Sequence, residues 1–190
     1  MESDIELMLR TKAGDDSAFS ELMNRHYKGV LNYIYRFTNL RENSEDLAQE
    51  VFLRVYRSAS KYRPEAKFTT WLYKIATNVS LTHVKKKNTN VSLDEMNENS
   101  GEYEDSEVEI SDDIIYRKEM KDLIIKAMET LPEREKISIM LCKYEGLSYE
   151  ETADVLECTV GAVKAYVHRG RMKLVNKLKP YLTDGGEYGL

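Results

Sequence analysis

The sequence predicts an all-α protein in which two small helical domains are joined by a flexible acidic linker. Apolar residues recur at the i, i+3, i+4, i+7 spacing of buried helical stripes in both halves of the chain. Only three prolines and nine glycines occur among the 190 residues, which leaves room for long helices. Between the two halves, residues 88–113 hold ten acidic side chains and no Lys or Arg.

This central segment sets the predicted domain boundaries. It buries too little apolar surface to offset the entropy lost on ordering, so we expect it to stay flexible. The prediction is a first domain at 1–87, a linker at 88–113, a second domain at 114–182 and a disordered tail at 183–190. Because the net charge of −5 averages the acidic linker with a net-positive remainder, it does not argue against nucleic-acid binding.

The first domain contains helical stripes separated by recognisable breaks. One stripe runs from Phe19 to Ile34. Asn43 and Ser44 can cap the next helix, which buries apolar residues between 48 and 55. The sequence Lys61-Tyr62-Arg63-Pro64 breaks that helix. A further helix with an apolar side from residue 68 to 79 then ends in three lysines.

The second domain shows helix start and stop signals at short intervals. A stripe between 116 and 127 is followed by Pro132 at a first-turn position, where its missing N–H costs nothing. Gly146 is expected to end the following helix. Ser148 and Glu151 form a capping box for a short helix, and Thr159 caps a longer last helix.

The last two helices have the pattern of a helix–turn–helix that binds duplex DNA. A very short turn separates them, and Ala153 is small where they must approach each other. From Thr159 to Lys179 the second helix carries no acidic residue, so its cations can neutralise phosphates. An ordinary solvated helix is the alternative interpretation. The exposed cations expected on it are Lys164, His168, Arg169, Arg171 and Lys173.

Two further groups of residues lie in the first domain. Asp46, Gln49 and Glu50 share the helix face opposite the apolar stripe, and they fit either a solvated face or a docking face for a partner protein. The stretch from Tyr62 to Lys74 interleaves aromatic rings with cations, as single-stranded nucleic acid requires for stacking and backbone contact. Phe68 and Trp71 also lie on the apolar stripe and suit the core.

Other functions are disfavoured by the composition. The chain contains no nucleotide-binding glycine loop, no metal-ligand spacing among its three histidines and no nucleophile–base pair, so we expect neither an enzyme nor a cofactor. Cys142 and Cys158 are expected to be semi-buried thiols. No stretch approaches the roughly 20 apolar residues that span a bilayer, and the acidic start is no secretory signal. We therefore expect a cytoplasmic protein without direct membrane insertion.

The motifs together resemble the extracytoplasmic-function (ECF, group IV) RNA polymerase sigma factors. Asp46-Leu47-Ala48-Gln49-Glu50-Val51-Phe52 and Phe68-Thr69-Thr70-Trp71-Leu72 are similar to region 2 of that family. Leu131-Pro132-Glu133 and Glu145-Gly146-Leu147-Ser148-Tyr149-Glu150-Glu151 are similar to region 4. The resemblance covers nearly all of the chain outside the linker and tail. Glu157 departs from it, since many members have glycine there, and so do Ala165 and Tyr166, where many have Ser-Arg.

The resemblance implies partners and residue roles. Asp46, Gln49, Glu50 and Phe52 would dock on the β′ coiled coil of core RNA polymerase, and region 4 would sit on the β flap. The minus-ten promoter element would be melted and read by Tyr62, Arg63, Lys67, Phe68, Thr70, Trp71, Lys74 and Asn78. The minus-thirty-five element would be read by Thr159, Lys164, Ala165, Tyr166, His168, Arg169 and Arg171.

The same resemblance implies a regulatory setting. The acidic linker would thread toward the active-site and RNA-exit channels, and an anti-sigma factor would hold the protein until stress or envelope-response genes are needed. No small-molecule substrate is expected. The alternative function is a stand-alone helix–turn–helix regulator, which would bind duplex DNA specifically without polymerase. The residues between Asp46 and Asn78 argue against that alternative, because such a regulator needs neither a docking face nor a strand-reading loop.

Overall fold

The computed structural model describes residues 2–40, 42–90 and 112–182, which fold into α-helices and two short helical turns of other types. In the first half these are α1 (Asp4–Lys12), α2 (Asp16–Thr38), α3 (Ser44–Arg57), the 3₁₀ turn η1 (Ala59–Lys61) and α4 (Phe68–Asn90). The second half contains α5 (Asp112–Glu129), α6 (Glu133–Ile139), the π-helical segment η2 (Met140–Tyr144), α7 (Tyr149–Leu156) and α8 (Val160–Leu182).

The predicted all-α class is confirmed for these ranges. Most of the predicted linker, together with the predicted tail at 183–190, lies outside the described residues. The break predicted at residues 61–64 is confirmed, because the chain has no regular helix between η1 and α4.

Local capping explains where the first helices begin. Ser3 and Glu6 form a capping box at α1, in addition to the caps predicted from the sequence. The Asp15 carboxylate accepts hydrogen bonds from the backbone N–H groups of Ser17 and Ala18 and so begins α2. Asn43 occupies the N-cap position of α3, as predicted, but its side chain makes no capping hydrogen bond.

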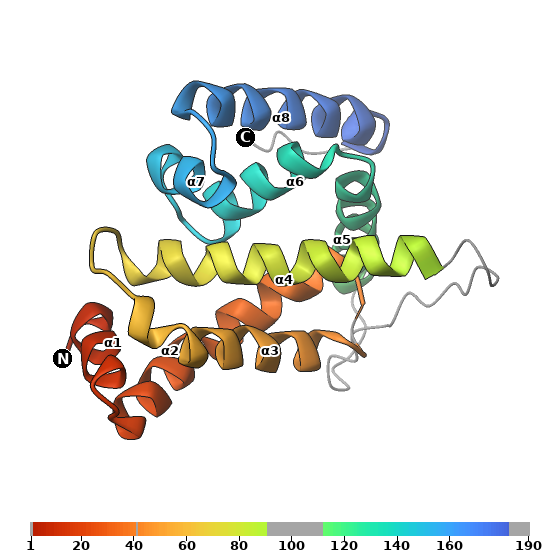
Figure 1. Ribbon diagram of the computed structural model, residues 1–190. Helices are drawn as coiled ribbons and strands as arrows, with labels where there is room; N and C mark the ends of the chain where they lie inside the picture. Colours follow the sequence, from red (N-terminus) through yellow and green to blue (C-terminus); the bar gives the residue numbers. More distant parts are fainter. Residues whose placement is uncertain (1, 41, 91–111, 183–190) are drawn as a thin grey trace.

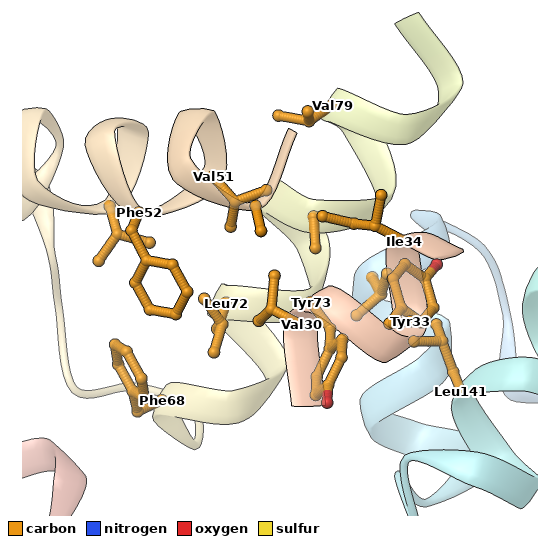
Figure 2. Packing of buried hydrophobic residues seen from close by; sticks show 14 of the residues in the cluster. Val30, Tyr33, Ile34, Val51, Phe52, Phe68, Leu72, Tyr73, Val79 and Leu141 are labelled. Atoms are coloured by element: carbon orange, nitrogen blue, oxygen red, sulfur yellow. The ribbon is translucent and has the colours of Figure 1, made fainter. Parts of the chain in front are cut away.

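The apolar stripes of α2, α3 and α4 meet in one core, shown in Figure 2. Val30 and Ile34 of α2, Val51 of α3 and Leu72 of α4 are each fully buried there. These residues carry the helical spacing seen in the sequence, so burial of the three stripes against one another accounts for the bundle.

Capping and close packing shape the second half. The capping box at Ser148 and the cap by Thr159, whose Oγ1 accepts a hydrogen bond from the Ala162 N–H, are both confirmed. Pro132 stands just before α6, at its N-cap position. Helices α6 and α8 approach closely at the buried Gly170, where a Cβ atom would lie 2.6 Å from Ile139 Cδ1.

The two halves pack against each other, which the sequence did not predict. A single apolar cluster contains Leu72 of α4 together with Leu141 of η2 and Val155 of α7. Figure 1 shows α4 lying between the helices of the first half and α6 to α8 of the second, and α7 packs directly on α4. Figure 2 shows Leu141 beside Tyr33, on the side of the core nearest the second half.

Candidate nucleic-acid interface and docking face

The outer face of α3 presents the predicted docking residues to solvent. Asp46 and Gln49 are exposed on it. Glu50 is half-buried and forms an ion pair with Arg54, whose Nε lies 2.7 Å from Glu50 Oε1. The three predicted residues therefore lie on one side of the helix and leave carboxylate and amide groups available to a partner.

Phe52 lies on the opposite side of α3. Its side chain is only 3% exposed and stacks against Tyr27 of α2. It therefore supports the helix from the core and does not reach the outer face. Leu53, which is not among the predicted docking residues, is 42% exposed on that outer face. The signal available in the sequence was a leucine placed off the apolar stripe, two turns after Asp46.

The aromatic residues of the predicted strand-reading stretch lie in a cluster inside the first half. Tyr62 is 1% exposed and Phe68 is 2% exposed. The ring of Tyr62 lies 5.1 Å from that of Trp71, centroid to centroid, and the tilted rings of Phe68 and Trp71 lie 6.2 Å apart. Trp71 is half-buried, so it is the member of this cluster with a surface toward solvent.

The polar residues of the same stretch divide between solvent and the second half. Arg63 and Asn78 are exposed. Lys67 Nζ lies 2.9 Å from Glu151 Oε1 of α7, and Lys74 Nζ lies 2.8 Å from Glu157 Oε1 just after α7. Thr70 is buried. The spacing of residues 67, 70 and 74 puts them along one side of the chain as it enters and follows α4.

The second helix of the helix–turn–helix presents a basic surface. Lys164, His168 and Arg171 are exposed on α8, as is the capping residue Thr159, whereas Ala165 and Tyr166 are half-buried. The backbone N–H groups at the start of this long helix and its exposed cations provide the groups that bind phosphate.

Arg169 is fixed by a hydrogen bond within the protein. Its Nε donates to Glu135 Oε1 of α6 over 3.1 Å, and Lys173 Nζ donates to the other carboxylate oxygen over 2.9 Å. Burial alone would raise the pKa of Glu135, but these two cationic donors outweigh it and lower that pKa. Glu135 thus joins α6 to α8, and Arg169 has a structural role in addition to its predicted contact with DNA.

The turn between α7 and α8 is compact because Glu157 adopts the left-handed conformation, with a φ of 51°. Glycine adopts this conformation without steric cost, whereas a residue with a Cβ atom does so less readily. Glu157 adopts it all the same, and its carboxylate lies within reach of Lys74.

A second set of polar contacts joins the two halves around Glu145, which follows η2. Its carboxylate accepts a hydrogen bond from the Tyr73 hydroxyl of α4, and Arg36 Nη1 of α2 lies 3.3 Å from Glu145 Oε1. The Glu145 side chain is only 7% exposed. Burial raises the pKa of Glu145, while Tyr73 and Arg36 act in the opposite direction without cancelling that effect. We call the contacts of Glu145 with Tyr73 and Arg36 the seam.

The buried carboxylate predicts a pH dependence of stability. Because the folded chain raises the pKa of Glu145, it binds the proton more readily than the unfolded chain does. The contribution of Glu145 to the free energy of unfolding should therefore fall as pH rises from its ordinary pKa of 4.5 through the raised value. Glu145→Gln should remove this contribution to the pH dependence. Thermal denaturation of wild type and variant at several pH values measures it, with exposed Glu133→Gln as the control. Parallel curves for wild type and Glu145→Gln would contradict the assignment.

Comparison with known proteins decides the family. The Sigma-70 region 2 profile matches residues 22–89, and the Sigma-70 region 4 profile matches residues 121–174. The chain is 30% identical to the RNA polymerase sigma-H factor of Pseudomonas aeruginosa, over 96% of this chain and 97% of that protein. It is also 30% identical to the ECF RNA polymerase sigma-E factor of Haemophilus influenzae, over 95% and 97% of the two chains.

The chain belongs to the ECF family of RNA polymerase sigma factors. Its fold is similar to that of CnrH in complex with the cytosolic domain of CnrY, with a TM-score of 0.69 at 19% identity, over 94% of this chain and 99% of that one. The sigma factor RpoE of Bartonella quintana, solved with the anti-sigma factor NepR, gives a TM-score of 0.67 at 19% identity, over 88% and 98% of the chains.

An ECF sigma factor is a transcription initiation factor and not an enzyme. It binds core RNA polymerase and directs it to promoter DNA. The comparisons therefore support the prediction of a sigma factor over that of a stand-alone regulator. Among the described helices of this sigma factor, none is long and apolar enough to cross a membrane. Cys142 and Cys158 are free, partly buried thiols, as expected.

Proposed function

We propose that this sigma factor docks on the β′ coiled coil of core polymerase through the outer face of α3. Asp46 and Gln49 supply polar and charged contacts, and Leu53 adds an apolar contact beside them. Non-obligate interfaces are about as polar as the rest of a protein surface, with apolar residues at the centre and polar residues at the rim, and this face offers both kinds of residue. Phe52 contributes by holding α3 in place, since it lies in the core.

We propose that the minus-ten element is read along residues 63–78. Arg63, Lys67, Lys74 and Asn78 provide cations and an amide for the strand, and Trp71 provides a ring with one accessible surface. Tyr62 and Phe68 do not contact DNA themselves; their buried rings pack against Trp71 and fix its position. Thr70 is only 4% exposed, so it can contact DNA only after the elements that bury it move away.

We propose that α8 reads the minus-thirty-five element in duplex form, while region 4 rests on the β flap. Lys164, His168 and Arg171 project from the helix, and Thr159 stands at its N-terminus. Ala165 and Tyr166 are half-buried on the same helix, so they can contact bases only if the DNA groove approaches the helix closely. Arg169 keeps its hydrogen bond to Glu135 and contacts the phosphate backbone of the DNA with its remaining N–H groups.

The protein is proposed to act in the cytoplasm under the control of an anti-sigma factor, directing polymerase to stress or envelope-response genes. Two proteins of similar fold were solved in complexes, one with the cytosolic domain of CnrY and one with the anti-sigma factor NepR. The observation that carries the whole proposal is the presence, on one chain, of the exposed α3 face and the basic α8.

Run-off transcription tests this function. Purified bacterial core polymerase and a genomic fragment library should give new discrete transcripts only when the chain is added. Their aligned start sites should show two conserved elements, one near minus ten and one near minus thirty-five. Tight binding of the chain alone to duplex DNA, with no new transcript from the polymerase of its own source, would instead support the stand-alone regulator.

A further inference from the structure

The second half of the molecule covers cations that the proposed function assigns to the minus-ten strand. Lys67 and Lys74 are both paired with carboxylates of the α7 region, Glu151 and Glu157. Single-stranded DNA binds such lysines through phosphate oxygens, which also are anionic acceptors. The two glutamates therefore occupy, in the free chain, the positions that phosphates would take.

The packing between the halves covers part of this side of α4. Helix α7 lies directly on α4. Thr70, which lies between the two lysines in sequence and on their side of the chain, is only 4% exposed. Its hydroxyl oxygen has no hydrogen-bond partner among the described residues. A polar side chain assigned to DNA is thus closed off from solvent.

The same compact arrangement is too small to span a two-part promoter. Elements centred near minus ten and minus thirty-five lie about 25 base pairs apart, or about 85 Å along B-form DNA. A compact chain of this length has a radius of gyration of about 16 Å. The two halves must therefore separate before α4 and α8 can each contact their own element.

The contacts that hold the halves together are unequal. The lysine ion pairs are largely exposed to solvent, so each contributes little and is screened by salt. Of Glu145, Glu151 and Glu157, Glu145 is the most buried, with its side chain 7% exposed. It faces Tyr73 and Arg36, with Tyr33 close enough to Glu145 for the two groups to interact electrostatically. Leu141, four residues before Glu145 in the sequence, belongs to the apolar cluster common to both halves.

We propose that the free sigma factor is self-inhibited: region 4 lies over region 2, and Glu151 and Glu157 shield Lys67 and Lys74 from single-stranded DNA until the seam opens. This inference rests on the proposed minus-ten role of those lysines. The closed form lowers the apparent affinity for DNA by the fraction of molecules that are open. A partner that separates the halves would then expose both promoter-reading surfaces at once.

Charge reversal at the seam tests the proposal in the full-length chain. Glu145→Arg places two cations together and should open the molecule, while the exposed Glu150→Arg makes the same change in net charge outside the seam. Small-angle X-ray scattering measures the radius of gyration, and fluorescence anisotropy measures binding of a labelled thymine-rich single-stranded oligonucleotide. We expect a larger radius and about tenfold tighter binding for Glu145→Arg only, as for a form about nine-tenths closed.

Two further variants keep the test decisive. Arg36→Glu should open the molecule from the other side, and the double variant Arg36→Glu/Glu145→Arg should close it again, which separates opening from misfolding. Adding Lys67→Ala and Lys74→Ala to Glu145→Arg should remove the gain in affinity. Equal radii for wild type, Glu145→Arg and Arg36→Glu would overturn the proposal. A larger radius without tighter binding would overturn the shielding and place the error in the minus-ten assignment, which run-off transcription tests independently.

Discussion

Replacing Asp46 with arginine should weaken binding to core RNA polymerase at least about tenfold and remove most run-off transcription. The side chain is exposed on α3 and contributes no contact to the core, so the fold should not change. Reversing a charge in an interface places like charges opposite each other, which costs several times RT and slows association as well. A loss of about tenfold corresponds to about 1.4 kcal/mol.

Glu45→Arg is the matched control for this variant. Glu45 is also exposed in the first turn of α3, but it points about 100° around the helix from Asp46. The two variants therefore have the same net charge and the same effect on the helix dipole. Affinity can be measured by titrating fluorescently labelled chain with core polymerase. If both variants bind as wild type does, the outer face of α3 is not the docking face.

Tyr62→Ala should destabilise the protein by about 3–5 kcal/mol, the range for truncating a buried aromatic residue. The ring is 1% exposed and packs against Phe68 and Trp71. Its hydroxyl group is buried with no hydrogen-bond partner among the described residues. Tyr62→Phe keeps the ring and removes a buried polar group, so it should raise the free energy of unfolding by about 1 kcal/mol.

Urea denaturation measures both Tyr62 variants, and run-off transcription separates packing from DNA contact. We expect Tyr62→Phe to transcribe as wild type does, because the hydroxyl faces the interior. A strong loss of transcription by Tyr62→Phe, without loss of stability, would show that the hydroxyl contacts the minus-ten strand and that the ring leaves the core when DNA binds.

Local features of the chain were predictable from sequence because they depend on neighbours a few residues apart. The capping box at Ser148 and the cap at Thr159 follow from side chains that bond to backbone one turn away. The buried positions of α2 to α4 follow from helical periodicity. The exposed placement of Asp46 and Gln49 follows from the same period, because they lie opposite the stripe.

Other features could not be predicted, because they depend on groups far apart in sequence. A sequence in which aromatic residues alternate with cations fits both a strand-binding surface and a core with charged residues at its edge. The burial of Tyr62 therefore could not be predicted from this pattern. The bond from Arg169 to Glu135 joins residues 34 positions apart. The contact of Arg36 with Glu145 spans 109 positions and crosses the acidic linker. No local period encodes such a pairing.

The π-helical segment η2 gives this stretch one residue to spare. A π-helical turn accommodates one residue more than an α-helical turn does, and here it lies between α6 and Glu145. Deleting one residue from Met140–Tyr144 would leave an ordinary α-helical turn in its place, so whatever follows would keep nearly the same direction and Glu145 would still face Tyr73. Deleting a second residue would have no such compensation and would rotate Glu145 away from Tyr73 by about 100°. The contact between the two halves therefore tolerates the loss of one codon in this segment but not of two, although neither deletion touches a DNA-reading residue.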